Sequence, residues 1–517
     1  MPRDRAEVRP SFEEFLRLAR RGNVIPVYRE ILADFETPLS AYLKLAGRGP
    51  SYLLESVEGG ERLGRYSFLG SSPAMVIESR GSQMRLTSRG RTRRWVTRTD
   101  PFRELEQLLR PYRSVEVPGL PRFCGGFVGY AGYDTVRFLE AVGDPKPDRL
   151  RVPDSVWLLS DTLVVFDHLE HLLQVVANAI LPQGSAGSLV QRARAAYAGA
   201  LSRLDRMTRA LRQPLPPRLV RRTKGRLGTT YRRRSRYVVP NVKSNMSAGA
   251  FTAAVREAKR AIAAGEAIQI VLSQRFEVPV TARPFEIYRA LRSLNPSPYM
   301  FHLDLGGFAL VGSSPEILVR CEDGVVEARP IAGTRRRGRT PAADLRIEEG
   351  LRRNAKERAE HLMLADLGRN DVGRVCEYGS VKVSDLMTVE RYSHVMHLVS
   401  HVQGRLRRGR GAFDVFRAAF PAGTVTGAPK VRAMQLINEL ERDARGPYAG
   451  AVGYFGFNGN LDTCITIRTV LVKDGRAFVQ AGAGIVADSQ PQREYQETRS
   501  KAAGMLEAIR LAERGLA

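Results

Sequence analysis

Cysteine is scarce in this sequence, which contains four in 517 residues. The four stand far apart and none belongs to a Cys-x-x-Cys pair, which argues against a disulfide framework and against a zinc ribbon. So few scattered thiols fit a reducing compartment such as the cytoplasm. The cysteines are Cys124, Cys321, Cys376 and Cys464.

Long apolar runs are also missing from the sequence. No segment reaches the roughly 18 uninterrupted apolar residues of a membrane-spanning helix. Residues 1–21 are charged throughout and contain no apolar core, unlike a secretory signal peptide. We therefore expect a cytoplasmic protein without a membrane partner.

Acidic residues are outnumbered, with 54 Asp and Glu against 81 Lys and Arg, which gives a net charge of +27. Such a charge is typical of nucleic-acid-binding proteins, and a basic protein of that class is one hypothesis. The basic residues, however, are spread along the chain without a nucleic-acid-binding motif or interleaved aromatic residues. The pattern favours a solvated, Arg-rich surface that attracts anionic substrates, and no nucleic-acid partner.

Strand-like runs punctuated by Gly and Pro dominate the first part of the chain, for example at 74–79 and 155–159. A helix predicted over 188–211 leads into a basic, Pro-containing segment over 212–241, which is typical of a linker or exposed loop. We therefore expect an N-terminal region, a basic linker and a C-terminal region, with bounds 1–205, 206–246 and 247–517.

The C-terminal region mixes helices and strands without regular alternation. Its first helix is predicted from an N-cap at Ser247 to Gly265, because apolar residues such as Phe251 and Val255 recur at helical spacing. A strand is predicted to follow over 267–273. Without a βαβ rhythm, we expect the α+β class and not a doubly wound sheet.

Two Glu-x-x-Glu pairs stand nearly 140 residues apart: Glu357 with Glu360, and Glu494 with Glu497. On a helix, residues i and i+3 share one face, so each pair can point two carboxylates in one direction. Four converging carboxylates repel one another unless a cation lies between them, and hard oxygen ligands suit Mg²⁺. Taken alone, each pair more often marks a solvated helix face.

Three Gly-containing stretches have the composition of ligand-binding loops. Residues 330–338 predict a tight turn whose N–H groups and guanidinium groups can bind a carboxylate. Residues 481–486 predict a Gly-Ala-Gly turn, after a strand over 477–480, that exposes donors to an anion. Residues 423–430 lack the Gly-Lys-Ser/Thr ending of a Walker A loop, which excludes nucleotide binding there.

Three histidines, His394, His397 and His401, would share a face on a helix. Their segment is rich in β-branched and apolar residues and is better read as a strand. On a strand His397 and His401 share one face and His394 takes the other, so a triple-His zinc site is excluded. One of them can serve as an acid or base in a cleft, although a lone His more often packs in a core.

Several ordered motifs make the sequence recognisable, among them Gly-Ser-Ser-Pro-Glu at 312–316, Pro-Ile-Ala-Gly-Thr at 330–334 and Gly-Thr-Val-Thr-Gly-Ala-Pro-Lys at 423–430. With them the chain resembles the large subunits of anthranilate synthases, within the family of chorismate-utilising enzymes, over nearly its whole length. The resemblance implies a β-sandwich-like core with helices outside, a regulatory N-terminal region and a catalytic C-terminal region.

The resemblance also implies a Mg²⁺ cofactor and a chorismate-binding cleft in the C-terminal region. Glu360 and Glu497 match direct metal ligands of the family, whereas Glu357 and Glu494 match positions that reach the metal through water. The positions that match substrate-binding residues are Gln269, Gly333, Thr334, Tyr448, Arg468, Gly482, Ala483 and Gly484.

The implied reaction has two stages. Ammonia adds at ring C2 of chorismate as the C4 hydroxyl leaves, and pyruvate is then eliminated as the ring becomes aromatic. Glu316 matches the proposed general acid for the departing hydroxyl, and His397 matches the histidine linked to elimination. Thr424 matches a position that contacts the substrate.

Two uncharged residues separate this reaction from those of other family members. Isochorismate and salicylate synthases carry a water-activating lysine where this chain has Gln269, whose neutral amide cannot act as that base. Many aminodeoxychorismate synthases carry a lysine where this chain has Ala332. Two alternatives stay open: an enzyme that stops at aminodeoxyisochorismate, and an enzyme of the para-aminobenzoate branch.

No Gly-x-Cys-x-Gly motif surrounds any cysteine, so the sequence contains no glutamine-amidotransferase segment. The resemblance implies that a separate amidotransferase subunit supplies the ammonia, in a heterotetramer of two large and two small subunits that serves tryptophan biosynthesis. It also implies feedback inhibition by tryptophan. The matching positions are Leu54, Glu55, Ser56, Pro298, Tyr299 and Met300.

Overall fold

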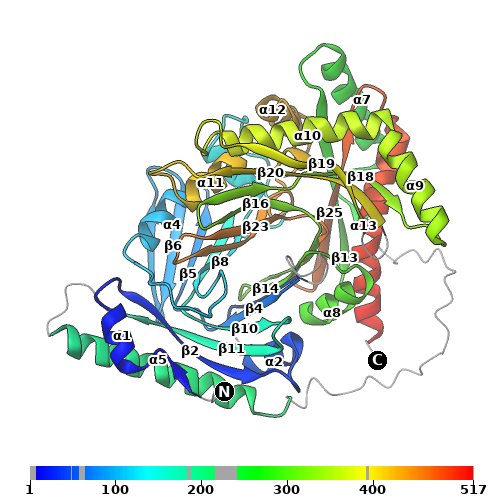
Figure 1. Ribbon diagram of the computed structural model, residues 1–517. Coiled ribbons are helices and arrows are strands. Elements are labelled where there is room, and N and C mark those ends of the chain that lie inside the picture. Colours follow the sequence, from blue (N-terminus) through cyan, green and yellow to red (C-terminus); the bar gives the residue numbers. More distant parts are fainter. Residues whose placement is uncertain are drawn as a thin grey trace.

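The computed structural model describes residues 7–47, 49–56, 64–182, 188–215, 242–391 and 395–515. Two large antiparallel sheets form its centre, and the helices lie around the outside of the strands (Figure 1). The predicted α+β class with a β-sandwich-like core and outer helices is confirmed. Within these ranges no helix is long and apolar enough to cross a membrane.

The first sheet joins strands from both halves of the chain. β3 (Ser51–Glu55) pairs antiparallel with β14 (Tyr299–Asp304), and this pair lies at the middle of the sheet. In spatial order the described strands are β1 (Val8–Arg9), β2 (Val24–Leu32), β11 (Leu172–Ile180), β10 (Thr162–Asp167), β4 (Tyr66–Ser71), β3, β14, β15 (Ala309–Ser314), β24 (Thr469–Lys473), β25 (Arg476–Ile485), β13 (Gln269–Pro279) and β12 (Lys243–Ser244), with β21 (Gly427–Ala428) beside β13.

The second sheet is shared in the same way, because β8 (Gly126–Ala131) pairs antiparallel with β22 (Ala451–Gly456). Its described strands, in spatial order, are β18 (Ile331–Arg336), β20 (Val395–Arg405), β17 (Val325–Ala328), β16 (Ile317–Glu322), β23 (Leu461–Ile465), β22, β8, β9 (Ser155–Ser160), β5 (Met75–Arg80), β6 (Gln83–Ser88) and β7 (Arg91–Val96), with β19 (Lys382–Arg391) beside β20. Strands from the N-terminal and the C-terminal region thus build each of the two sheets. The division into a regulatory region that ends at residue 205 and a catalytic region that begins at residue 247 stays a prediction.

Side-chain caps begin several of the helices. Ser247 accepts a hydrogen bond from the N–H of Ala250 at 3.1 Å, and Ser188 and Gln191 form a reciprocal capping box. The helices are α1 (Phe12–Leu18), α2 (Pro38–Leu45), α4 (Pro101–Leu109), α5 (Leu189–Leu211), α7 (Ala248–Ala263), α8 (Pro284–Leu294), α9 (Pro341–Arg353), α10 (Ala355–Gly373), α11 (Ala412–Ala419), α12 (Lys430–Leu440) and α13 (Pro491–Arg514), with 3₁₀ turns η1 (Tyr133–Phe138) and η2 (Gly423–Val425).

Most of the predicted elements are present. The helices predicted over 188–211 and from Ser247 are α5 and α7, and the strands predicted at 74–79, 155–159 and 267–273 correspond to β5, β9 and the start of β13. The histidine segment is a strand, β20, as predicted, although His394 lies outside the described residues. Most of the predicted linker, residues 216–241, also lies outside them.

Two predicted turns are wrong, because the stretches at 330–338 and 481–486 contribute strands β18 and β25. Close approach, and not a turn, explains the glycines of β25: a Cβ on Gly482 would lie 2.6 Å from the Tyr448 hydroxyl, and one on Gly484 would lie 2.6 Å from Gln269 Nε2. In β18 the glycine marks a register shift, where Gly333 has φ +60°.

Candidate active site

A cavity of about 530 Å³ collects most of the residues predicted from the sequence. Strands β13 and β25 of the first sheet, strands β18 and β20 of the second, and helices α10 and α13 all contribute side chains to its wall. The predicted residues that line it are Gln269, Glu316, Gly333, Glu357, Glu360, His397, Thr424, Tyr448, Arg468, Gly482, Gly484, Glu494 and Glu497.

One predicted residue, Ala483, is placed differently, and the side chain of Thr334 lies outside the described part of the chain. The side chain of Ala483 packs in the hydrophobic core beside Ile270 and Leu272, because it faces the opposite side of β25 from its two glycine neighbours. Thr334 of β18 pairs with His397 of β20 across the ladder. The sequence-based prediction treated residues 482–484 as one substrate-binding group, whereas on β25 Ala483 faces the side opposite to Gly482 and Gly484.

The four carboxylates reach the cavity from two helices. Asn354 caps α10 by accepting from the N–H of Glu357 at 3.0 Å, which places Glu357 and Glu360 in the first two turns. Glu494 and Glu497 occupy the corresponding turns of α13, which begins at Pro491. Two pairs of acidic groups at helix starts thus face one cavity, as their i, i+3 spacing predicted.

Cations of the chain already neutralise one carboxylate of each pair. Arg335 donates to Glu357 at 2.9 Å, and Lys501 lies 2.8 Å from Glu497. The pKa of Glu360 is raised by burial, and the charge of neighbouring Glu357 adds to the effect. The pKa of Glu494 is raised by burial too, and Glu497 contributes. An additional cation beside them would favour the ionised form of Glu360 and Glu494.

The carboxylate oxygens of the four glutamates are hard ligands of the kind that Mg²⁺ prefers, so these residues fit a Mg²⁺ ion chemically. Gln269 Nε2 donates to Glu360 Oε1 at 3.2 Å, while Gln269 Oε1 is buried and has no hydrogen-bond partner within the described ranges. Across those ranges no three acidic, His or Cys side chains converge closely enough to hold a metal. Two of the four carboxylates, Glu357 and Glu497, instead form ion pairs with Arg335 and Lys501.

The buried Glu316 and the half-buried Thr424 form a pair at another wall of the cavity. Thr424 Oγ1 donates to Glu316 Oε1 at 2.7 Å. Burial raises the pKa of Glu316 to about 7, against opposing contributions from the Thr424 hydrogen bond and the charge of Arg468. A carboxyl group with this pKa can carry a proton near neutral pH and release it, which suits a general acid.

His397 lies in the same cavity and is 4% exposed. Burial lowers its pKa to about 4, the charge of Arg468 lowers it further, and a backbone hydrogen bond to Gly333 opposes both. The imidazole is therefore neutral at pH 7 and is able to accept a proton.

The remaining wall offers groups for an anionic ligand. Arg468 is half-buried and adopts the left-handed backbone conformation, with φ +49°. Tyr448 lies beside Gly482, and its ring also faces the guanidinium group of Arg445 at 5.6 Å from the ring centroid. Burial raises the pKa of Tyr448 to about 12, so its hydroxyl stays a hydrogen-bond donor. A guanidinium and a phenol together suit a carboxylate.

A family model described as chorismate binding enzyme matches residues 49–507. The chain belongs to this family. Anthranilate synthase component 1 of Pseudomonas aeruginosa is 48% identical over 98% of this chain and 99% of its own length. The component 1 of Acetivibrio thermocellus is 45% identical over 97% and 98%. The resemblance recognised in the sequence is thereby confirmed.

Solved structures of chorismate-binding enzymes agree with this assignment. The crystal structure of anthranilate synthase component I from Streptococcus pneumoniae TIGR4 is 36% identical and superposes with a TM-score of 0.72, covering 92% of this chain and 99% of that one. The menaquinone-specific isochorismate synthase of Escherichia coli is 19% identical, with a TM-score of 0.65 over 96% and 98%. This second likeness shows a shared fold.

Some cavity residues of this chorismate-binding enzyme were not predicted from the sequence: Arg335, Lys356, Gln480 and Lys501. Gln480 Nε2 donates to Ser273 Oγ at 2.9 Å, and among the described residues its Oε1 has no partner. A signal was available for Lys501, which follows Glu497 by one helical turn and also donates to the carbonyl of Gly482 at 3.1 Å. Gln480 shares a strand face with Gly482, two residues on.

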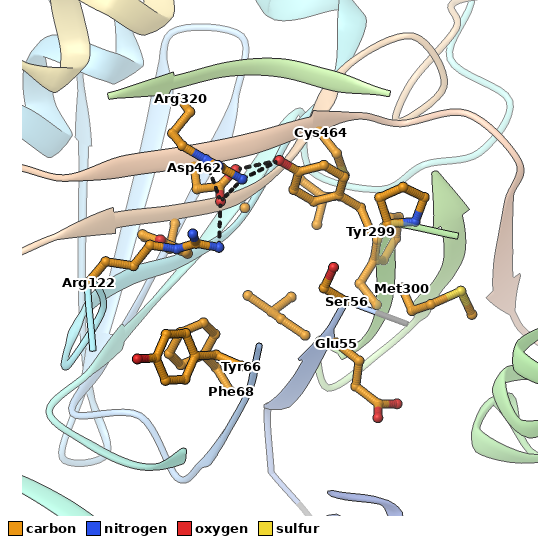
Figure 2. A pocket seen from close by; sticks show the side chains of 16 residues that line it. Glu55, Ser56, Tyr66, Phe68, Arg122, Tyr299, Met300, Arg320, Asp462 and Cys464 are labelled. Atoms are coloured by element: carbon orange, nitrogen blue, oxygen red, sulfur yellow. Dashed lines mark hydrogen bonds and ion pairs between the residues drawn. The ribbon is translucent and has the colours of Figure 1, made fainter. Parts of the chain in front are cut away.

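A second, smaller cavity of about 50 Å³ contains all six residues predicted for tryptophan feedback. It lies between the adjacent strands β4, β3 and β14 of the first sheet and strands β16, β22 and β23 of the second. Figure 2 shows a polar cluster around Asp462 opposite Tyr66 and Phe68. Asp462 accepts from the Tyr299 hydroxyl at 2.8 Å and from Arg320 Nε at 3.2 Å. Ser56 Oγ is buried here and has no partner in the described part of the chain.

Proposed function

We propose that the chain converts chorismate and ammonia to anthranilate and pyruvate, the first committed step of tryptophan biosynthesis. One observation carries the proposal: a single cavity presents two carboxylate pairs, a carboxyl with a pKa of about 7 at Glu316, and the neutral base His397. Relatives 45–48% identical over nearly their whole length are named anthranilate synthase component 1.

Two groups of cavity residues would bind the metal and the substrate. Glu360 and Glu497 would hold Mg²⁺ directly, and Glu357 and Glu494 would hold it through water. The ion would supply a Lewis acid and a template for the ring carboxylate. Arg468 and Tyr448 bind the enolpyruvyl carboxylate.

The acid and the base act in separate stages. Glu316 gives its proton to the C4 hydroxyl, which leaves as water while ammonia forms the new bond at C2. His397 then removes the proton at C2, the enolpyruvyl group leaves from C3, and the ring becomes aromatic. The neutral state of His397 at pH 7 supports its role as the base in the second stage.

Two neutral side chains support anthranilate as the product. Gln269 and Ala332 both line the cavity. By the resemblance noted above, family members with other products carry a lysine at these two positions. Incubation of the protein with chorismate, Mg²⁺ and ammonium should produce the fluorescence of anthranilate. Accumulation of aminodeoxyisochorismate or of 4-amino-4-deoxychorismate instead would contradict the proposal and establish one of the two alternatives.

Replacement of His397 by alanine should separate the two stages. Addition of ammonia does not need the imidazole, whereas loss of a general base costs about 10²–10⁴-fold in the step that it serves. Chromatography of single-turnover samples should therefore show aminodeoxyisochorismate building up while anthranilate formation falls. His401→Ala is the matched control, because His401 lies on the same strand outside the cavity. Normal anthranilate production by His397→Ala would contradict the assignment of His397 as the base of the second stage.

We also propose that the cavity beside Ser56 binds tryptophan and inhibits the enzyme. Its aromatic walls, Tyr66 and Phe68, suit an indole, and Arg122 and Arg320 supply positive charge for a carboxylate. Ser56→Phe would fill much of the 50 Å³, and such overpacking should raise the inhibitory tryptophan concentration about tenfold or more. Steady-state assays with and without tryptophan test this, and unchanged sensitivity with normal basal activity would refute it.

The partner assignments belong to the same proposal. We expect a glutamine amidotransferase small subunit to supply ammonia in the cytoplasm, in a heterotetramer of two large and two small subunits. The component 1 naming of the relatives supports the existence of a second component. Sedimentation of the chain mixed with a cognate amidotransferase should show a complex that turns over glutamine.

A further inference from the structure

A buried ion pair lies behind the wall of the catalytic cavity. Glu441 follows the last residue of α12, and Arg445 stands four residues later in the loop that leads to β22. Arg445 Nε donates to Glu441 Oε2 at 2.9 Å, and Arg445 Nη2 donates to Glu441 Oε1 at 2.7 Å. The Arg445 side chain is 1% exposed, and neither residue lines the cavity. A substrate in the cavity therefore does not touch this pair.

Two further hydrogen bonds of Arg445 reach the backbone of the cavity wall. Nη1 donates to the carbonyl of Val425 at 2.8 Å, and Nη2 donates to the carbonyl of Val271 at 2.7 Å. Val425 follows Thr424 in η2, Val271 lies on β13, and both line the cavity. One guanidinium group thus joins two wall segments that are far apart in the sequence.

Two aromatic rings lie against the same guanidinium group. The Arg445 Cζ atom is 4.7 Å from the ring centroid of Tyr133 and 5.6 Å from that of Tyr448. A cation is attracted to the face of an aromatic ring, and more strongly where water is excluded. Because Tyr448 is one of the proposed substrate-binding residues, a third part of the wall depends on the position of Arg445.

Glu441 connects the pair to strand β13. Its Oε1 accepts from the N–H of Ser273 at 2.8 Å and from Ser273 Oγ at 2.9 Å. Ser273 Oγ accepts in turn from Gln480 Nε2, and Gln480 lines the cavity. Burial of two charges often costs as much free energy as their attraction returns, so stability alone is a weak reason for such a pair.

We propose that Glu441 and Arg445 are positioning residues, which hold Thr424 against Glu316 and Tyr448 against the carboxylate of the substrate. The inference rests on the proposed function, because it assigns what keeps the acid and the carboxylate-binding wall of that reaction in place. A planar guanidinium group suits the task, since its fixed donors bind a carboxylate and two carbonyls while its faces meet aromatic rings.

Two variants and a matched control test the proposal. Arg445→Lys keeps the positive charge beside Glu441 but replaces the planar fork by a single ammonium group. The double variant Glu441→Met/Arg445→Met removes both charges together, a change that proteins often tolerate without loss of stability. Arg275→Lys is the control, because Arg275 is 5% exposed, bonds to Asp443 and to the carbonyl of Ala444 at 3.2 Å in the same loop, and does not line the cavity.

The measurement is the pH profile of kcat for anthranilate formation, together with the KM for chorismate. Both variants should move the fall of kcat at high pH to higher pH, because a displaced Thr424 no longer stabilises the ionised form of Glu316. The KM for chorismate should rise about tenfold as Tyr448 shifts. Arg275→Lys should change neither. The pH at which kcat falls does not depend on the amount of folded protein, so a loss of stability alone cannot imitate this result.

Combination of Arg445→Lys with Thr424→Val gives a second check. The combined variant should show the fall of kcat at the same pH as Thr424→Val alone, since both changes remove one and the same hydrogen bond to Glu316. A further shift in the combined variant would contradict the proposal.

The proposal is overturned if kcat of the folded variants falls at the wild-type pH, or if Arg275→Lys has an equal effect. Loss of folding in both Arg445→Lys and the double methionine variant would also overturn it, because the pair would then serve the stability of the fold. Circular dichroism establishes which variants fold. A wild-type protein that forms no anthranilate would instead overturn the proposed function, and that result is read before any variant is compared.

Discussion

Replacement of Glu360 by glutamine should lower kcat about a thousandfold, because losing the direct metal ligand that we propose there would remove several kcal/mol of transition-state stabilisation. The amide keeps the shape of the side chain but loses its charge, and Gln269 Nε2 can still donate to its oxygen. Calorimetric titration with Mg²⁺ in the absence of substrate should show a matching loss of affinity. Glu497→Gln should behave in the same way.

Substitutions of Glu357 and Glu494 serve as the comparison that distinguishes direct metal ligands from residues that act through water. Glu357→Gln and Glu494→Gln should lower Mg²⁺ affinity by about 10–100-fold, as expected for groups that act through water. Glu349→Gln on α9 should change nothing, since Glu349 is exposed and pairs only locally with Arg353. A larger loss from Glu357→Gln than from Glu360→Gln would reverse the predicted order of ligands.

The convergence of the four carboxylates on one cavity was predictable because their arrangement depends on short-range periodicity. The i, i+3 spacing of Glu357 and Glu360, and of Glu494 and Glu497, fixes their direction once α10 and α13 form. The strand at His397 was predictable for a similar reason, since its β-branched residues favour an extended chain. These features need little knowledge of tertiary structure.

The wrong predictions concern residues whose role depends on distant neighbours. Gly482 and Gly484 suggested a turn by composition, yet they are glycines because Tyr448 and Gln269 approach the strand closely. The pairing of Glu316 with Thr424 joins residues 108 positions apart, and the ion pair of Arg335 with Glu357 joins a bulged strand to a helix. No local pattern in the sequence encodes these contacts.

Replacement of Glu316 by glutamine should lower kcat about 10²–10⁴-fold, the usual contribution of a general acid, because an amide cannot deliver a proton to the leaving hydroxyl. The pH profile distinguishes this role from a structural one. With a pKa of about 7, wild-type Glu316 loses its proton as pH rises, so kcat should fall about tenfold per unit above pH 7. The residual activity of Glu316→Gln should lack this falling limb.

Thr424→Val supplies an independent check through the sign of a pKa shift. The Thr424 hydrogen bond favours the ionised carboxylate and lowers the pKa of Glu316. Its removal should raise that pKa and move the falling limb of kcat to higher pH, with valine conserving the volume. The proposal is contradicted if the fall of kcat at high pH occurs at the same pH in Thr424→Val as in the wild type. It is also contradicted if that fall persists in Glu316→Gln, and in either case another group must supply the catalytic proton.

The same pKa makes folding stability depend on pH. The folded-state pKa of Glu316 lies above its ordinary 4.5, so the fold favours the protonated form. This contribution is fully present below pH 4.5 and is lost as pH rises through about 7, amounting to about 3 kcal/mol in total. Urea unfolding near the two ends of that window should show the loss in the wild type and not in Glu316→Gln. Catalysis by this carboxyl thus costs stability at the pH where it begins to ionise, because the burial that raises its pKa also penalises its charged form.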